Sequence, residues 1–293
     1  MTSAHSEARD CDDRPMRYAI KTAPQMTTWQ AMLEVWRAAD DIELFESAWN
    51  FDHFEPILGK PRNGPCLEGW TTLAALAQAT SRIRVGCMVT GMPYRHPAVL
   101  ANMAATLDHI SGGRLELGLG AGWNREEADA YGIELPPLRE RFDRFDEGCE
   151  VIVSLLSEDR SDYAGDHFTL SGAYCEPKAL QTPHPPITIG GDGPTRTLRA
   201  VARYAQRWNT PFASAGSLAA SVEVLHGHCA EIGRDPAEIT ITAQCIHDPD
   251  AGAAATAEAC AELGEAGCDL TVVYLPESHH NAAEVERLAD ALG

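Results

Sequence analysis

The sequence predicts a TIM barrel, an α/β fold of eight (β/α) units, built by one large domain. Segments with the apolar pattern of strands alternate with helical segments about eight times along the chain. The 293 residues, of which 44% are hydrophobic, are enough for one large core. Glycine-rich turns follow the fourth and fifth strands. A doubly wound sheet, which is the alternative, usually carries its glycine fingerprint after the first strand.

The strands are predicted from short apolar or alternating runs bounded by turn residues. In chain order they are expected at 16–22, 44–50, 83–90, 115–119, 186–189, 207–210, 239–243 and 270–275. Strict alternation with helices implies parallel strands joined by right-handed crossovers. The carboxyl ends of the strands should therefore meet on one rim, where a barrel carries its active site.

Helices are expected between these strands. The first begins behind Thr27 or Thr28 as N-cap and has apolar residues from Met32 to Ala39 at helical spacing. The others are expected at 70–80, 98–109, 140–156, 195–205, 218–232 and 252–266. A β-hairpin at 162–170 lies within an insertion at about 157–185. Residues 1–15 are polar and acidic, and we expect a loose tail before a single domain at 16–293.

Composition excludes several functions. The formal net charge of −20 opposes binding to nucleic acid or to an anionic membrane. The chain has no apolar run of the roughly 18 residues that a membrane span needs, and we expect no signal peptide in its polar, acidic first residues. Its nine cysteines are scattered without a C-x-x-C pair, which suits free thiols in a reducing cytoplasm. We therefore expect a cytoplasmic enzyme with a small-molecule substrate, and a homodimer is possible through the outer helices.

Asp52 and His53 follow the second strand and are the candidate acid and base. Histidine titrates near neutrality, and a carboxylate beside it can orient the ring. Adjacent residues at a strand end tend to point in opposite directions, so Asp52 has the alternative of bonding to backbone instead. A metal site of the barrel hydrolase type would need His-x-His near the end of the first strand. The chain has Lys21-Thr22 there, so no metal is expected.

Glycines follow the fourth and fifth strands. In SGGRLELGLGAGW, residues 111–123, Gly118, Gly120 and Gly122 alternate, which suits either a ligand-binding backbone or a tight loop that caps a buried strand. Trp123 comes next, on the expected rim. After the fifth strand, a helix begins behind a further glycine loop, which predicts a phosphate site made of Gly190, Gly191, Gly193 and Arg196.

Three segments in this order resemble the bacterial luciferase-like monooxygenase superfamily. They are Asp52-His53-Phe54, Arg95-His96-Pro97 and the glycine segment at 111–123. Within that superfamily, GPCLEGWTTLAA at 64–75 and RERFD at 139–143 are similar to the branch assigned to the deazaflavin coenzyme F-420. The resemblance implies a TIM barrel with insertions and hydride transfer between this coenzyme and a small organic substrate. The alternative is an FMN-dependent monooxygenase that uses oxygen and a separate reductase. A non-catalytic binding barrel is a third possibility.

The resemblance also implies roles for individual residues. A flavin-shaped ring should lie across the mouth, against a non-prolyl cis peptide at Met88–Val89 or one residue earlier. His53 should contact the reacting region, with Asp52 as its partner. Related dehydrogenases have a glutamate where this chain has Trp123, which leaves reduction of an unsaturated or carbonyl substrate more open than alcohol oxidation. The expected cofactor contacts are Met88, Val89, Thr90, Gly120, Gly122, Trp123, Gly190, Gly191, Gly193 and Arg196.

Overall fold

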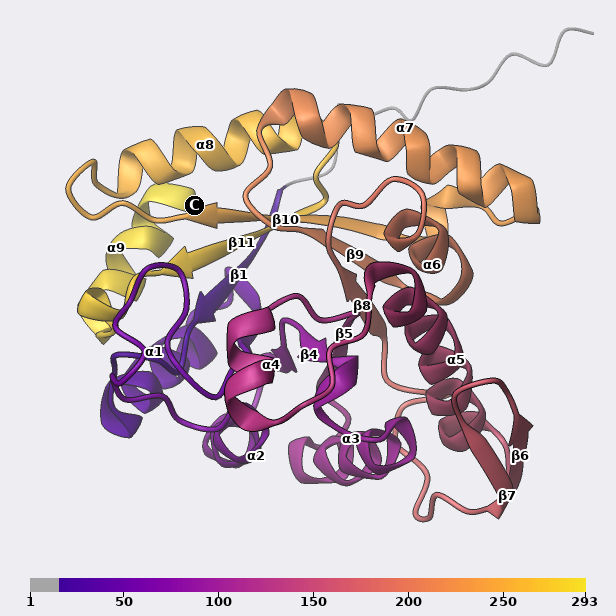
Figure 1. Ribbon diagram of the computed structural model, residues 1–293. Helices are drawn as coiled ribbons and strands as arrows, with labels where there is room; N and C mark the ends of the chain where they lie inside the picture. Colours follow the sequence, from indigo (N-terminus) through magenta and orange to yellow (C-terminus); the bar gives the residue numbers. More distant parts are fainter. Residues whose placement is uncertain (1–15) are drawn as a thin grey trace, which may run out of the picture.

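The computed structural model describes residues 16–293 and shows the predicted barrel (Figure 1). The wall of the described chain is made of eight parallel strands: β1 (Arg17–Thr22), β2 (Phe45–Asn50), β3 (Arg84–Cys87), β5 (Leu115–Gly120), β8 (Ile187–Gly190), β9 (Arg207–Thr210), β10 (Thr240–Ile246) and β11 (Leu270–Leu275). β1 pairs with β2 and β11, and the pairing of β3 with β5 closes the sheet on itself. The tail expected at 1–15 lies outside the described residues.

The third strand differs from the prediction. We expected one strand at 83–90, but β3 ends at Cys87 and a separate β4 (Thr90–Gly91) pairs with β5 further along. Met88 and Val89 lie between the two pieces, outside the ladder. The strand therefore bulges at the level where the barrel opens to its mouth.

Helices cover the outside of the barrel. In Figure 1, α7 (Ala215–Ile232) and α8 (Ala253–Glu265) run above the strands, and α2 (Gly69–Ala79) and α3 (Pro97–Ser111) lie below. The remaining helical elements are α1 (Trp29–Asp41), α4 (Arg125–Tyr131), α5 (Leu138–Ser157), α6 (Thr197–Tyr204), α9 (Ala282–Leu292) and the 3-10 turns η2 (Met92–Tyr94), η3 (Pro236–Glu238) and η4 (Glu277–His279).

The sequence prediction missed α4 and α9. Each follows an N-cap asparagine whose side chain accepts a hydrogen bond from the backbone N–H three residues later. Asn124 caps α4 by accepting from Glu127, and Asn281 caps α9 by accepting from Glu284. An asparagine is among the best N-cap residues, so these two starts carried a local signal that went unused.

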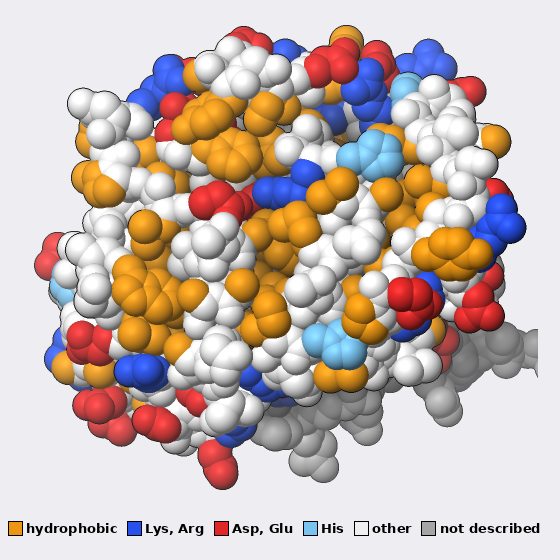
Figure 2. Space-filling view, turned by 90° about the horizontal axis from the view of Figure 1, so that it is seen from below, with side chains coloured by type: hydrophobic (Ala, Val, Ile, Leu, Met, Phe, Trp, Pro, Cys, Tyr) orange, Lys and Arg blue, Asp and Glu red, His pale blue; other side chains and the backbone are white. Residues whose placement is uncertain are grey.

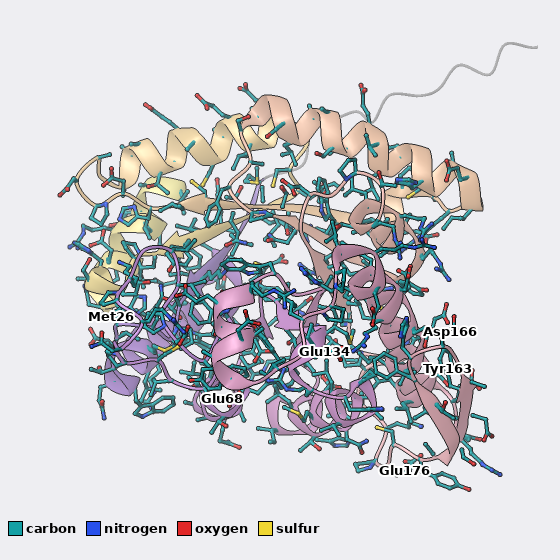
Figure 3. All side chains as sticks on the ribbon, in the orientation of Figure 1. Met26, Glu68, Glu134, Tyr163, Asp166 and Glu176 are labelled. Carbon is teal, nitrogen blue, oxygen red and sulfur yellow. The ribbon has the colours of Figure 1, made fainter. Side chains whose placement is uncertain are left out.

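The predicted hairpin is present and is tied to α5. β6 (Ser161–Ala164) and β7 (Thr169–Ala173) pair antiparallel. The Tyr163 hydroxyl donates to Glu150 Oε2 at 2.8 Å, and the Asp166 amide donates to Glu147 Oε1 at 2.9 Å. Figure 3 labels Tyr163 and Asp166 beside α5, away from the barrel strands. The insertion therefore lies apart from the mouth.

The surface seen from below mixes apolar, acidic and basic side chains (Figure 2). Among residues 16–293, no helix is long and apolar enough to cross a membrane. The cysteines of this part of the chain form no disulfide with one another.

A buried carboxylate neutralises two arginines inside the barrel. Glu116 on β5 is fully buried, and its two oxygens face Arg84 on β3 and Arg207 on β9. The Arg207 Nε lies 3.1 Å from Glu116 Oε2, and its Nη1 lies 2.9 Å from Glu46 Oε1. Three strands are thereby linked by ion pairs to one fully buried carboxylate.

We expect Glu116→Gln to lower the free energy of unfolding by about 3 kcal/mol or more, because both arginines lose their buried counter-charge. Glu46→Gln is the matched control, since Glu46 also faces Arg207 but keeps 29% of its side chain exposed. We expect this control to cost about 1 kcal/mol or less. Urea unfolding of the three proteins measures both values, and equal losses would contradict the prediction.

Candidate active site

A cavity of about 340 Å³ opens at the carboxyl ends of the strands, a size usual for small-molecule sites. The structure brings eight of the predicted residues together around it. They are His53, Met88, Val89, Gly120, Gly122, Trp123, Gly190 and Gly191. Segments that are up to about half the chain apart thus meet at one mouth, as the strand order requires.

One wall of the cavity is made by the bulge of the third strand and by glycines. The Met88–Val89 peptide is cis, at the place that the family resemblance implied. A Cβ on Gly120 would lie 2.6 Å from Val89 Cγ2, and one on Gly190 would lie 2.9 Å from Val89 Cγ1. A Cβ on Gly118 would overlap the Cys87 carbonyl oxygen. These glycines therefore make room for the bulge.

This geometry revises the interpretation of the glycine segment. Gly118 and Gly120 are part of β5, where Gly118 pairs with Thr188 of β8 and Gly120 pairs with Gly91 of β4. Gly118 was already inside the strand expected at 115–119, and β5 extends to Gly120, so these two glycines do not form an anion-binding loop. The flat backbone that they leave still faces the cavity at Gly120, as it does at Gly190 and Gly191.

His53 is held by a carboxylate, but not by the one that the sequence suggested. Its Nδ1 lies 2.7 Å from Glu127 Oε2, on α4. Glu127 also accepts the Tyr94 hydroxyl and, at 2.7 Å, the backbone N–H of Phe54. Among the described residues, no hydrogen bond to His53 Nε2 is present, so that nitrogen is available to a molecule in the cavity.

Asp52 points away from His53, which corrects the predicted pair. Its carboxylate accepts hydrogen bonds from both terminal nitrogens of Arg95, at 2.5 Å and 2.8 Å, and from the Gly91 N–H at 3.3 Å. The adjacent side chains diverge because successive residues leave an extended backbone on opposite sides. Glu68, labelled in Figure 3, lies 3.9 Å from the same arginine. Asp52 is thus a structural ion-pair partner.

Electrostatics around His53 favour an ionised glutamate. Burial raises the pKa of Glu127, but the hydrogen bonds from His53, Tyr94 and Phe54 outweigh burial, and the net pKa is lowered. Burial, followed by the bond to Glu127, raises the pKa of Tyr94. Tyr94 therefore stays protonated and donates, while Glu127 carries the negative charge that orients the imidazole.

The sequence interpretation missed a polar group on the opposite wall. Lys21 at the end of β1 lines the cavity together with Asn209, Gln244 and Tyr274. The Lys21 Nζ donates to Gln244 Oε1 at 2.9 Å, and Gln244 Nε2 donates to Asn209 Oδ1 at 2.9 Å. The signal was the alternation in β1, because Lys21 lies two residues after Ala19, which packs inside the barrel.

Three predicted cofactor contacts are not in the lining of this cavity. Thr90 is buried, and its hydroxyl accepts Trp70 Nε1 at 3.1 Å. The Gly193 carbonyl accepts the Leu198 N–H in the first turn of α6. Arg196 lies 2.6 Å from Asp143 and 3.5 Å from Asp146, both on α5. Arg196 therefore has acidic partners on α5, and the phosphate site expected there stays a prediction.

The residues present fit the ring of a deazaflavin or flavin better than its phosphate. The wall of Met88, Val89, Gly120, Gly190 and Gly191 is apolar and free of large side chains apart from Met88. The Trp208 Nε1 donates to the Gly191 carbonyl at 2.7 Å and fixes the turn. Among residues 16–293, no cluster of three or more metal-ligating side chains occurs.

The buried Lys21 amine should lower stability below its pKa. Burial lowers that pKa from about 10.5 to about 8. Between these values the unfolded chain keeps its proton and the folded chain releases it, so stability rises with pH. We expect Lys21→Met to raise the free energy of unfolding at pH 7 by roughly 1 to 3 kcal/mol.

Urea unfolding from pH 7 to 10.5 measures this effect, and the difference from the unmodified protein should shrink as pH rises through 8. Lys60→Met is the control, since Lys60 is 43% exposed beside Glu277, and we expect a change below about 1 kcal/mol at every pH. A Lys21→Met variant that is less stable at pH 7 would contradict the prediction.

Known proteins share this fold and parts of this sequence. An uncharacterised protein of Mycobacterium tuberculosis is 31% identical over 229 residues, or 77% of this chain and 76% of the relative. An F-420-dependent glucose-6-phosphate dehydrogenase of Amycolatopsis mediterranei is 33% identical over 172 residues, 58% of this chain and 48% of that enzyme.

A solved structure of an F-420-dependent secondary alcohol dehydrogenase with an F-420-acetone adduct has a TM-score of 0.82. The two chains are 19% identical, and the match covers 95% of this chain and 99% of the other, so it shows the fold. The family model of luciferase-like monooxygenases matches residues 15–291. The chain therefore belongs to the luciferase-like monooxygenase family.

Proposed function

We propose that the chain is a coenzyme F-420-dependent oxidoreductase that transfers a hydride between the deazaflavin and a small organic substrate. The observation that carries the proposal is the cavity itself, with a flat glycine and bulge wall at one side and His53 at its edge. Several similar proteins are F-420-dependent dehydrogenases, which supports this cofactor over FMN. We also propose that the enzyme is cytoplasmic and acts on a small molecule.

The cofactor, when bound, supplies the hydride chemistry, and Met88, Val89, Gly120, Gly190 and Gly191 would hold its ring. The role of His53 is proton transfer. Glu127 accepts from Nδ1 and leaves Nε2 facing the cavity, where it gives a proton to the substrate during reduction or takes one during oxidation. Trp123 lies edge-on to His53, with ring centroids 5.5 Å apart, and lines the cavity beside it.

The alternative is an FMN-dependent monooxygenase on the same scaffold, which would need oxygen and a reductase. The two cofactors can be compared directly, because oxidised F-420 and FMN have different absorption and fluorescence. We expect the purified protein to bind F-420 at least about tenfold more tightly than FMN, a difference of roughly 1.4 kcal/mol. Tight binding of FMN without binding of F-420 would overturn the proposal.

We expect His53→Ala to lower kcat about 100-fold in the reduction of 2-cyclohexen-1-one by reduced F-420, because the positioned proton donor is lost. Glu127→Gln should lower it roughly 10-fold by removing the anion that orients the ring. Stopped-flow absorbance of the cofactor measures both rates. The affinity for F-420 should stay within about threefold.

Glu126→Gln is the matched control, since Glu126 is the exposed neighbour on α4 and pairs with Arg62. It should leave the rate unchanged. If the His53→Ala variant kept the rate of the unmodified protein, His53 would have no part in proton transfer.

A further inference from the structure

Lys21 is a buried cation for which the described residues supply no anionic partner. The side chain is nearly inaccessible, and its Nζ donates to the neutral carbonyl of Gln244 at 2.9 Å. Among the described residues, no carboxylate lies within ion-pair distance of it. Burying a charge without a partner costs free energy, so we expect a bound molecule to supply the partner of this lysine.

The neighbours of Lys21 are held in fixed positions around it, and Lys21 itself lines the cavity. Gln244 donates its amide to Asn209, and Asn209 in turn donates to the Thr242 hydroxyl at 2.9 Å. This chain of bonds holds the Gln244 carbonyl toward Lys21. An ammonium group has three donors, and one is used here, so two remain for a molecule in the cavity.

The outer part of the cavity is apolar. Leu58 and Phe212 line it and are 57% and 49% exposed, and Trp123 beside them is 58% exposed. Leu58 and Phe212 both have positive φ, 57° and 53°, a conformation that is uncommon for residues other than glycine. Two large apolar side chains thus line the rim from an uncommon backbone conformation.

We propose that Lys21 is the residue that binds the carboxylate of an organic acid substrate, whose apolar body contacts Leu58, Phe212 and Trp123. The assignment rests on the proposed function, in which substrate and cofactor meet in this cavity. A carboxylate supplies the single negative charge that Lys21 lacks, and its oxygens accept the two remaining N–H donors. A neutral carbonyl would leave the cation unpaired. A phosphate dianion would need a second cation, and the described lining holds one lysine and no arginine.

The titration of Lys21 can be observed without interference from its neighbours. The titratable side chains around it are Tyr274 on β11 and Cys87 on β3, while β9 and β10 contribute the neutral amides of Asn209 and Gln244. Burial raises the pKa of both Tyr274 and Cys87. They stay neutral up to about pH 9, so a loss of anion binding near pH 8 reports Lys21. His53 also lines the cavity, and the comparison with Lys21→Met separates its contribution from that of Lys21.

Calorimetric titration with octanoate and with 1-octanol tests the proposal, because the two probes share a chain and differ in charge. At pH 7 we expect octanoate to bind at least about tenfold more tightly than octanol, and the difference to close by about pH 9.5. Lys21→Met should weaken octanoate binding roughly 10- to 100-fold and leave octanol within about twofold. Lys60→Met, outside the cavity lining, should change neither.

Binding of F-420, measured by its fluorescence, separates this proposal from the previous one. We expect Lys21→Met to keep the F-420 affinity within about threefold. Equal binding of octanoate and octanol by the unmodified protein, or equal octanoate binding by Lys21→Met, would overturn the carboxylate site. A variant that loses F-420 while keeping octanoate would assign Lys21 to the cofactor. Octanoate binding that depends on Lys21, without F-420 binding, would overturn the cofactor and leave the carboxylate site standing.

Discussion

The architecture depends on the space that three missing side chains leave beside the third strand. Gly118, Gly120 and Gly190 lie in β5 and β8 where a Cβ would meet the Cys87 carbonyl or the side chain of Val89. Because the barrel closes through the pairing of β3 with β5, this contact decides both closure and the shape of the mouth. The bulge, the flat wall and the cavity are consequences of the same packing.

Two acidic residues at the rim, Asp52 and Glu127, have different roles. Asp52 neutralises Arg95 inside the rim, while Glu127 comes from a short helix and holds His53. Glu127 also accepts from the loop that carries His53, through the Phe54 amide. A carboxylate with several donors stays ionised although it is buried, and the imidazole is therefore oriented by a charge that does not vary near neutral pH.

Much of the barrel could be predicted from the sequence, because apolar periodicity reports burial and burial is what a barrel wall requires. Periodicity says nothing of side-chain partners, so Asp52 was placed with its neighbour in sequence and Glu127, 74 residues from His53, was not considered. Gly120, Gly122, Gly190 and Gly191 were expected at the mouth and do line the cavity, whereas Gly193 does not. The sequence pattern did not show that Gly120 and Gly190 lie against Val89 of another strand. Arg196 follows the glycine loop, where a phosphate ligand is expected. Its ion pairs with Asp143 and Asp146 of α5 could not be predicted from that position.

The hydrogen bonds of Glu127 limit which residues of this site can be substituted without displacing His53. The helix α4 and the loop after β2 are locked together around one carboxylate, so neither can move without disturbing the histidine. Phe212 belongs to another loop, and Leu58, although it lies further along the loop after β2, takes no part in the hydrogen bonds of Glu127. Replacing those two side chains alters the shape of what enters while the reacting groups keep their places. New specificities can therefore arise on this chain through changes at the rim alone.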